Sequence, residues 1–75
     1  MKIEILGSGC PKCKQLYKNT QEAIKAIGKE AEVIKVEDIK KITEYGIMMT
    51  PGLVVDGEVK SVGKVLTPDE IKTLL

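Results

Sequence analysis

The two cysteines of this chain are the residues whose type and spacing first suggest chemistry. Both lie in the stretch GSGCPKC, residues 7–13, at Cys10 and Cys13, and the chain contains no other cysteine. Thiols three positions apart lie on one face of a helix, close enough to form a disulfide with little backbone movement. The spacing therefore predicts a pair that cycles between dithiol and disulfide.

Position along the predicted helix distinguishes the two thiols. Cys10 falls at the helix start, where unpaired N–H groups and the helix dipole favour a thiolate, and Lys12 adds a positive charge beside it. Pro11 at the first helical position costs no hydrogen bond and stiffens the loop. Cys13 follows on the predicted buried stripe. The pattern favours Cys10 as the nucleophile and Cys13 as the resolving thiol.

A strand over residues 2–6 and a helix from Pro11 to a stop at Gly28 would position the pair. Gly7 and Gly9 between them suit a tight turn, and a second interpretation is that they let a partner backbone approach Cys10. A second strand is predicted over residues 31–36. A strand, a helix and a second strand in this order imply parallel pairing with a right-handed crossover.

The second half predicts a short helix, a hairpin and a final helix. Asp38 is an N-cap for a helix that closes at Gly46, and Asp56-Gly57 lies at the turn of a hairpin over residues 53–60. Thr67-Pro68-Asp69-Glu70 is typical of a capped helix start. The order β-α-β-α-β-β-α predicts a four-stranded mixed sheet covered by helices, in one domain over residues 1–75.

Composition excludes several function classes. The chain is 43% hydrophobic and 31% charged, has no arginine, and has only Tyr17 and Tyr45 as aromatics. Nucleic-acid binding is therefore not expected. The weakly polar run over residues 46–55 is too short to cross a membrane, and the N-terminus has no signal-peptide pattern, so we expect a cytoplasmic protein. In that compartment a close cysteine pair indicates catalysis, redox sensing or metal binding.

The chain resembles a minimal member of the thioredoxin and glutaredoxin superfamily. The resemblance rests on Cys10-Pro11-Lys12-Cys13 after the first strand, on the element order, and on Thr50-Pro51 directly before the hairpin. It implies a thioredoxin-like three-layer α/β fold that lacks the N-terminal strand and helix of full-length thioredoxins. It also implies a monomeric dithiol-disulfide oxidoreductase without cofactor or metal. Its partners would be disulfide-containing proteins and an upstream thiol reductase.

The resemblance also assigns roles to residues outside the cysteine motif. Pro51 would be cis and packed against the disulfide, and Thr50 would offer backbone groups to an extended substrate. Gly9 stands where thioredoxins carry tryptophan, next to the nucleophile. Apart from the resemblance, Met48 and Met49 directly precede Thr50. Methionine is more often core filling, and the second interpretation is an adaptable apolar rim for protein partners.

Glu4, six residues before Cys10, corresponds to a buried acid that moves the proton of the resolving cysteine in thioredoxins. The alternative is a glutamate on an edge strand paired with a lysine. Two other functions stay open at this point. One is a zinc site in which a dimer shares four thiolates. The other is a binding or sensor module whose disulfide switches a surface.

Overall fold

A computed structural model describes residues 1–7, 9, 11–47 and 49–75 of the chain. Its elements follow the predicted order and are β1 (Lys2–Leu6), α1 (Pro11–Ile27), β2 (Glu32–Val36), α2 (Ile39–Glu44), β3 (Gly52–Val55), β4 (Glu58–Val62) and α3 (Pro68–Leu74). β2 begins one residue later than predicted, and the hairpin strands extend slightly beyond residues 53–60.

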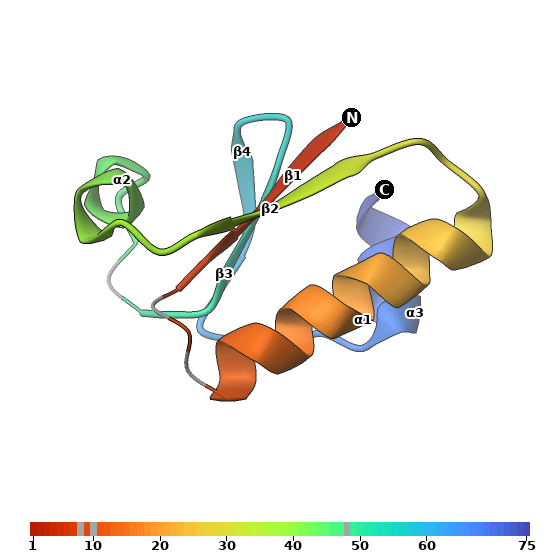
Figure 1. Cartoon of the computed structure of the whole chain (residues 1–75), viewed down its shortest axis with the longest axis horizontal. Coiled ribbons are helices and arrows are strands. Elements are labelled where there is room, and N and C mark those ends of the chain that lie inside the picture. Colours follow the sequence, from red (N-terminus) through yellow and green to blue (C-terminus); the bar gives the residue numbers. More distant parts are fainter. Residues whose placement is uncertain (8, 10, 48) are drawn as a thin grey trace.

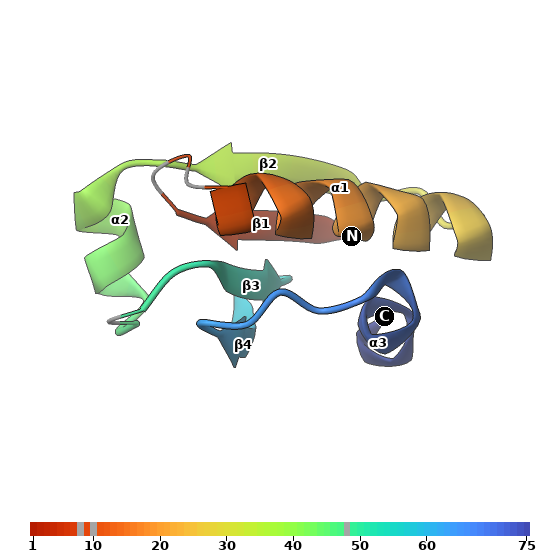
Figure 2. The same cartoon turned by 90° about the horizontal axis from the view of Figure 1, so that it is seen from below.

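The four strands form one mixed sheet in the order β2-β1-β3-β4. β1 pairs with β2 in parallel and with β3 in antiparallel register, so β1 and β3 are the inner strands. α1 and α3 lie side by side on one face of the sheet, and α2 lies on the other (Figures 1 and 2). This three-layer arrangement is the predicted thioredoxin-like fold.

Local sequence signals account for the ends of the elements. α1 is followed by Gly28 at φ 67°, and the hairpin turn places Asp56 and Gly57 at φ 50° and 83°. These positive values suit a helix stop and a tight hairpin turn. The side chain of Asp38 accepts a hydrogen bond from the N–H of Lys40 and thereby caps α2.

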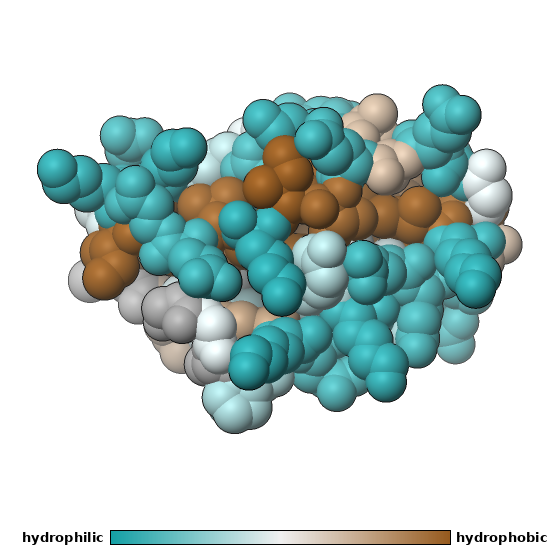
Figure 3. All heavy atoms as spheres, in the orientation of Figure 1, coloured by the Kyte–Doolittle hydropathy of each residue, from teal (hydrophilic) through white to brown (hydrophobic). Residues whose placement is uncertain are grey.

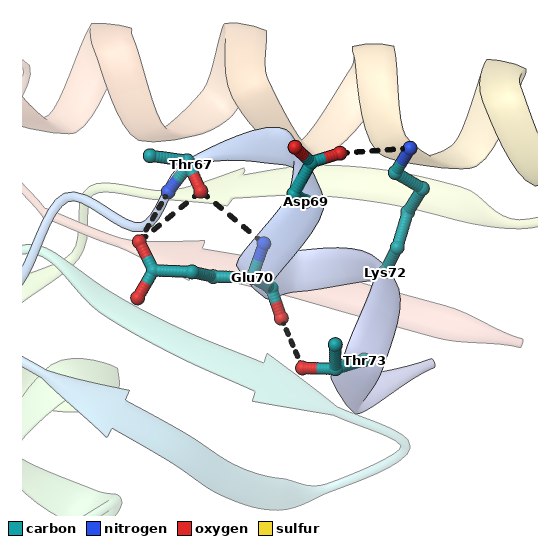
Figure 4. Close-up of polar contacts among 5 residues, drawn as sticks. All are labelled: Thr67, Asp69, Glu70, Lys72 and Thr73. Carbon is teal, nitrogen blue, oxygen red and sulfur yellow. Dashed lines mark hydrogen bonds and ion pairs between the residues drawn. The ribbon is translucent and has the colours of Figure 1, made fainter.

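α3 begins with the predicted capping box. The Thr67 hydroxyl accepts a hydrogen bond from the N–H of Glu70, and the Glu70 carboxylate accepts one from the N–H of Thr67 (Figure 4). Asp69 and Lys72 form an ion pair one turn apart, at 3.0 Å. A helix of seven residues is short, so these end contacts matter more than its intrinsic propensity.

Two apolar clusters hold the layers together. The larger one joins β1 and β3 to α1 and α3, and its buried members are Ile3, Ile5, Leu16, Ala23, Leu53, Val55, Leu66 and Ile71. The smaller one, on the other face, contains Leu6, Ile42, Ile47 and Val54. Successive residues of β1 therefore alternate between the two clusters, as a strand requires.

One buried polar residue of α1 was not predicted from the apolar spacing. Asn19 is 9% exposed, and its amide nitrogen donates to the carbonyl of Leu66 at 2.8 Å. Its amide oxygen accepts from Gln15 at 2.8 Å. Asn19 thus fastens the middle of α1 to the segment that leads into α3, and both of its polar atoms are satisfied in a buried position.

The outer strand β2 is only half-buried, in contrast to the inner strands. An apolar band follows the face where β2 lies, with hydrophilic side chains on both sides of it (Figure 3).

Within the part of the chain that the structure describes, no helix is long and apolar enough to span a membrane.

Candidate functional site

The side chain of Cys13 lies in the first turn of α1 and packs against the end of β1. It is 5% exposed and disulfide-bonded. A Cβ added at Gly7 would lie 2.2 Å from the Cys13 sulfur and 3.8 Å from the Cβ of Thr50. Because real atoms do not approach so closely, only glycine fits between β1 and the sulfur. Gly7 therefore sets how near the helix lies to the strand.

Gly7 and Gly9, predicted together as turn residues, have different structural roles. Gly9 has a φ of 84°, which glycine adopts readily, and a Cβ there would meet no atom within 4 Å. Gly7 is not among the glycines with positive φ, and its N–H donates to the carbonyl of Val36 at 2.9 Å. Gly9 thus serves the turn, whereas Gly7 makes room for Cys13.

The Thr50–Pro51 segment meets this site from the β3 side. The Thr50–Pro51 peptide bond is cis, which confirms that expectation, and Pro51 is buried while Thr50 is exposed. The carbonyl of Pro51 accepts a hydrogen bond from the N–H of Gly63 at 2.8 Å. This bond fixes the segment to the end of β4. Thr50 is therefore an exposed residue close to Gly7 and Cys13.

Met49 extends the surface next to Thr50. It is 64% exposed, and its side chain lies over Gly63, where an added Cβ would be 3.3 Å from both the Cβ and the Cε of Met49. An exposed methionine on a glycine is a pliable apolar surface rather than core filling. Of the predicted methionine rim, Met48 lies outside the described residues.

Pro11 and Lys12 of the cysteine motif lie at the start of α1. The helix begins at Pro11, as predicted, and both Pro11 and Lys12 are exposed. No acidic residue occupies the first turn, so nothing there offsets the positive end of the helix dipole. Cys10, the predicted nucleophile, lies outside the described residues.

Glu4 lies on the opposite face of the sheet from α1. Its neighbours Ile3 and Ile5 pack toward α1, so the Glu4 carboxylate projects toward α2. There its side chain, 13% exposed, forms an ion pair with Lys2 at 3.5 Å and accepts a hydrogen bond from the hydroxyl of Tyr45. The edge-strand alternative was wrong about position, because β1 lies inside the sheet, although its lysine pairing is present.

Tyr45 belongs to a polar cluster with Lys2 and Glu4, and the sequence pattern did not reveal this contact. Tyr45 is the C-cap of α2, and its hydroxyl reaches Glu4 across the sheet face. The hydrogen bond to the Glu4 carboxylate, with burial adding to it, raises the pKa of Tyr45 above its ordinary value of 10.0. The long separation of 41 residues gave no local signal.

A small hollow opens beside Cys13 between the ends of β1, α1 and β2. It is lined by Ile5, Gly7, Gly9, Cys13, Lys14, Lys35 and Glu37. Sequence reasoning missed the two lysines and the glutamate, because charged residues recur throughout the chain. Among the described residues, no group of three or more His, Cys, Asp or Glu side chains is placed to hold a metal ion.

The comparisons with known proteins cover most or all of the chain. A family model described as "Thioredoxin domain" matches residues 1–75. A protein named "Thioredoxin" from Methanothermobacter thermautotrophicus is 47% identical over 75 residues, which cover 100% of this chain and 97% of the relative. Another named "Thioredoxin", from Methanocaldococcus jannaschii, is 41% identical over 70 residues, 93% of this chain and 80% of the relative. A "Probable Thioredoxin" from Methanothermobacter marburgensis is 34% identical over 67 residues, 84% and 79% of the two chains.

Proposed function

Because the chain belongs to the thioredoxin family and is a dithiol-disulfide oxidoreductase, we propose that Cys10 and Cys13 form its redox-active pair. The observation that carries this proposal is the position of Cys13. It is disulfide-bonded, lies in the first turn of α1, and packs against Gly7 with Thr50 alongside. A buried sulfur in this position suits a resolving thiol, which must stay shielded until the nucleophile has reacted.

In the proposed reaction the two thiols act one after the other. The Cys10 thiolate attacks a substrate disulfide, forms a mixed disulfide and releases one substrate thiolate. Cys13 then attacks the Cys10 sulfur, which releases the second substrate thiol and leaves a bond between Cys10 and Cys13. The exposed start of α1, together with Lys12, favours the thiolate, and Pro11 stiffens the turn between the two sulfurs.

The substrates in this proposal are protein disulfides. An extended segment around the target disulfide would lie along Gly9 and Thr50, beside the buried Pro51, and Met49 would offer it an apolar surface. The exposure of Thr50 and Met49 next to the site supports this assignment. Glu4 would tune the pair only through its charge, because its side chain lies on the other face of β1.

The cellular setting is proposed on the same basis. Residues 1–75 would act as one monomeric domain in the cytoplasm, where an upstream thiol reductase would return the oxidised pair to the dithiol form. The protein would thereby help to keep cellular thiols reduced. No cofactor takes part in this cycle, since the two sulfurs carry both electrons.

Trapping experiments with the cysteine variants test the assignment. With a disulfide-bonded protein substrate, Cys10→Ser should abolish exchange, and Cys13→Ser should accumulate a mixed disulfide that mass spectrometry detects. The wild type should yield reduced substrate and no lasting adduct. Exchange by Cys10→Ser at the wild-type rate would contradict the proposal.

An equilibrium redox titration, with free thiols counted by mass spectrometry, then gives the direction of electron flow. We expect a reversible two-electron potential between about −280 and −180 mV, the range of reducing and exchanging family members. A pair that resists reduction well below about −300 mV would instead be a structural bridge.

A further inference from the structure

The hollow beside Cys13 lies on the other side of β1 from the Thr50–Pro51 segment. β2 and β3 flank β1, and Thr50–Pro51 directly precedes β3, whereas Lys35 and Glu37 come from the end of β2. The redox site thus has two walls with different chemistry. The β3 wall, formed by Met49, Thr50 and Pro51, is uncharged and partly apolar. The β2 wall, formed by Lys14, Lys35 and Glu37, carries charge.

Two cations and one anion line the β2 wall. Lys14 comes from α1 and Lys35 from β2. Glu37 follows two residues after Lys35 and lines the same hollow. The Lys35 ammonium lies 4.6 Å from the centre of the Tyr17 ring. Tyr17 is one helical turn beyond Cys13, so this cation–π contact holds the ammonium beside the helix that carries the sulfur.

We propose that this hollow selects disulfide substrates that carry a carboxylate close to the sulfur atoms. The proposal rests on the function proposed above and names the chemistry of the substrates that react best. The carboxylate would lie between Lys14 and Lys35 while the substrate sulfur is attacked. Its source is either a small acidic disulfide or an acidic residue next to the cystine of a protein.

The selected step is balanced without any further reactant. The reduced pair and one disulfide give the oxidised pair and two substrate thiols, so two electrons pass from the protein to the substrate. The lysines take no part in the bond exchange. Their positive charges lower the free energy of an anionic substrate as it approaches the thiolate and while it is held in the mixed disulfide. Salt should weaken this effect because the lysines are exposed.

Three disulfides of similar size test the selection. They are 3,3′-dithiodipropionate, which is anionic, bis(2-hydroxyethyl) disulfide, which is neutral, and cystamine, which is cationic. The readout is the second-order rate constant for oxidation of the reduced protein. The wild type should prefer the anionic compound over the neutral one. Lys14→Gln and Lys35→Gln should each reduce this ratio about threefold, the size expected for an exposed charge pair.

Matched variants separate the hollow from the net charge of the protein. Lys25→Gln removes the same charge from the last turn of α1, far from Cys13, and should leave the ratio unchanged. Lys35→Arg retains the charge and should preserve most of the preference. Glu37→Gln removes the anion and should increase the ratio. Peptide disulfides with Glu or Gln beside the cysteine identify the source, since selection there as well points to protein substrates.

The two proposals fail in different ways. If the neutral disulfide oxidises the wild type but the ratio is the same in Lys14→Gln, Lys35→Gln and Lys25→Gln, the hollow does not select anions and this inference is wrong. If none of the three disulfides oxidises the reduced wild type, the exchange function itself is wrong, and the inference falls with it.

Discussion

The two faces of β1 carry opposite kinds of structure. Toward α1, Ile3 and Ile5 join the larger apolar cluster, and Cys13 packs so closely on Gly7 that no Cβ fits. Toward α2, the same strand presents Glu4, which pairs with Lys2 and Tyr45 in a polar, partly open cluster. The face toward α1 therefore fixes the sulfur by packing, while the face toward α2 adds charge and hydrogen bonds around Glu4 to its smaller apolar cluster.

Truncating one core residue on each face should show the largest difference. Leu16→Ala removes a fully buried side chain of the larger cluster, and Ile42→Ala removes a 7% exposed one of the smaller cluster. We expect losses of about 4 and about 2 kcal/mol in the free energy of unfolding, because the smaller cluster collapses more easily around a cavity. Urea unfolding measures both, and equal losses would contradict the comparison.

A smaller effect is expected where the packing meets the sulfur. Gly7→Ala should destabilise the oxidised protein by about 3 kcal/mol, since the new Cβ would lie 2.2 Å from the Cys13 sulfur. Reduction frees the Cys13 side chain to rotate away. The reduced protein should therefore lose less stability, and urea unfolding in both redox states measures the difference.

Gly28→Ala is the control for this experiment. Unlike Gly7, Gly28 has a positive φ, at 67°, and a Cβ there meets nothing within 4 Å. Its replacement should cost about 1 kcal/mol from backbone strain alone, by the same amount in both redox states. If Gly7→Ala behaved in the same way, Gly7 would matter for backbone conformation rather than for room at the sulfur.

Most of the fold could be predicted because its signals are local. The stops at Gly28 and Gly46, the Asp56-Gly57 turn and the Thr67 capping box each depend on residues within a few positions of one another. The start of β2 was missed by one residue, which is the usual uncertainty at the end of an element.

The site could be predicted only where a motif names it. The position of Cys13 followed from cysteine spacing, and the cis bond before Pro51 followed from the family resemblance. The contact of the Glu4 side chain with Tyr45 depends on how α2 docks onto the sheet. The two residues are 41 positions apart in the sequence, so no local pattern encodes their contact. The contact of Lys35 with Tyr17 was missed because it depends on how α1 packs against β2, which no local pattern encodes either.

The smallest effect should come from the polar face, and it depends on pH. Tyr45→Phe removes the hydrogen bond to Glu4 and should cost about 1 kcal/mol at neutral pH. Because the pKa of Tyr45 is raised in the folded protein, its stabilising contribution is complete below pH 10.0 and is lost as the pH rises through the folded value. The stability of the wild type should therefore decline toward that of Tyr45→Phe above pH 10.0.

Absorbance of tyrosinate measures the underlying titration directly. The chain has two tyrosines, so in a Tyr17→Phe background the absorbance reports Tyr45 alone. Glu4→Gln in that background should return the pKa of Tyr45 toward its ordinary value, because the carboxylate bond is the largest cause of the increase. Lys60→Gln, on the outer strand β4, removes a charge elsewhere and should leave the titration unchanged. A Tyr45 titration insensitive to Glu4→Gln would mean that burial, rather than the Glu4 contact, holds the polar face together.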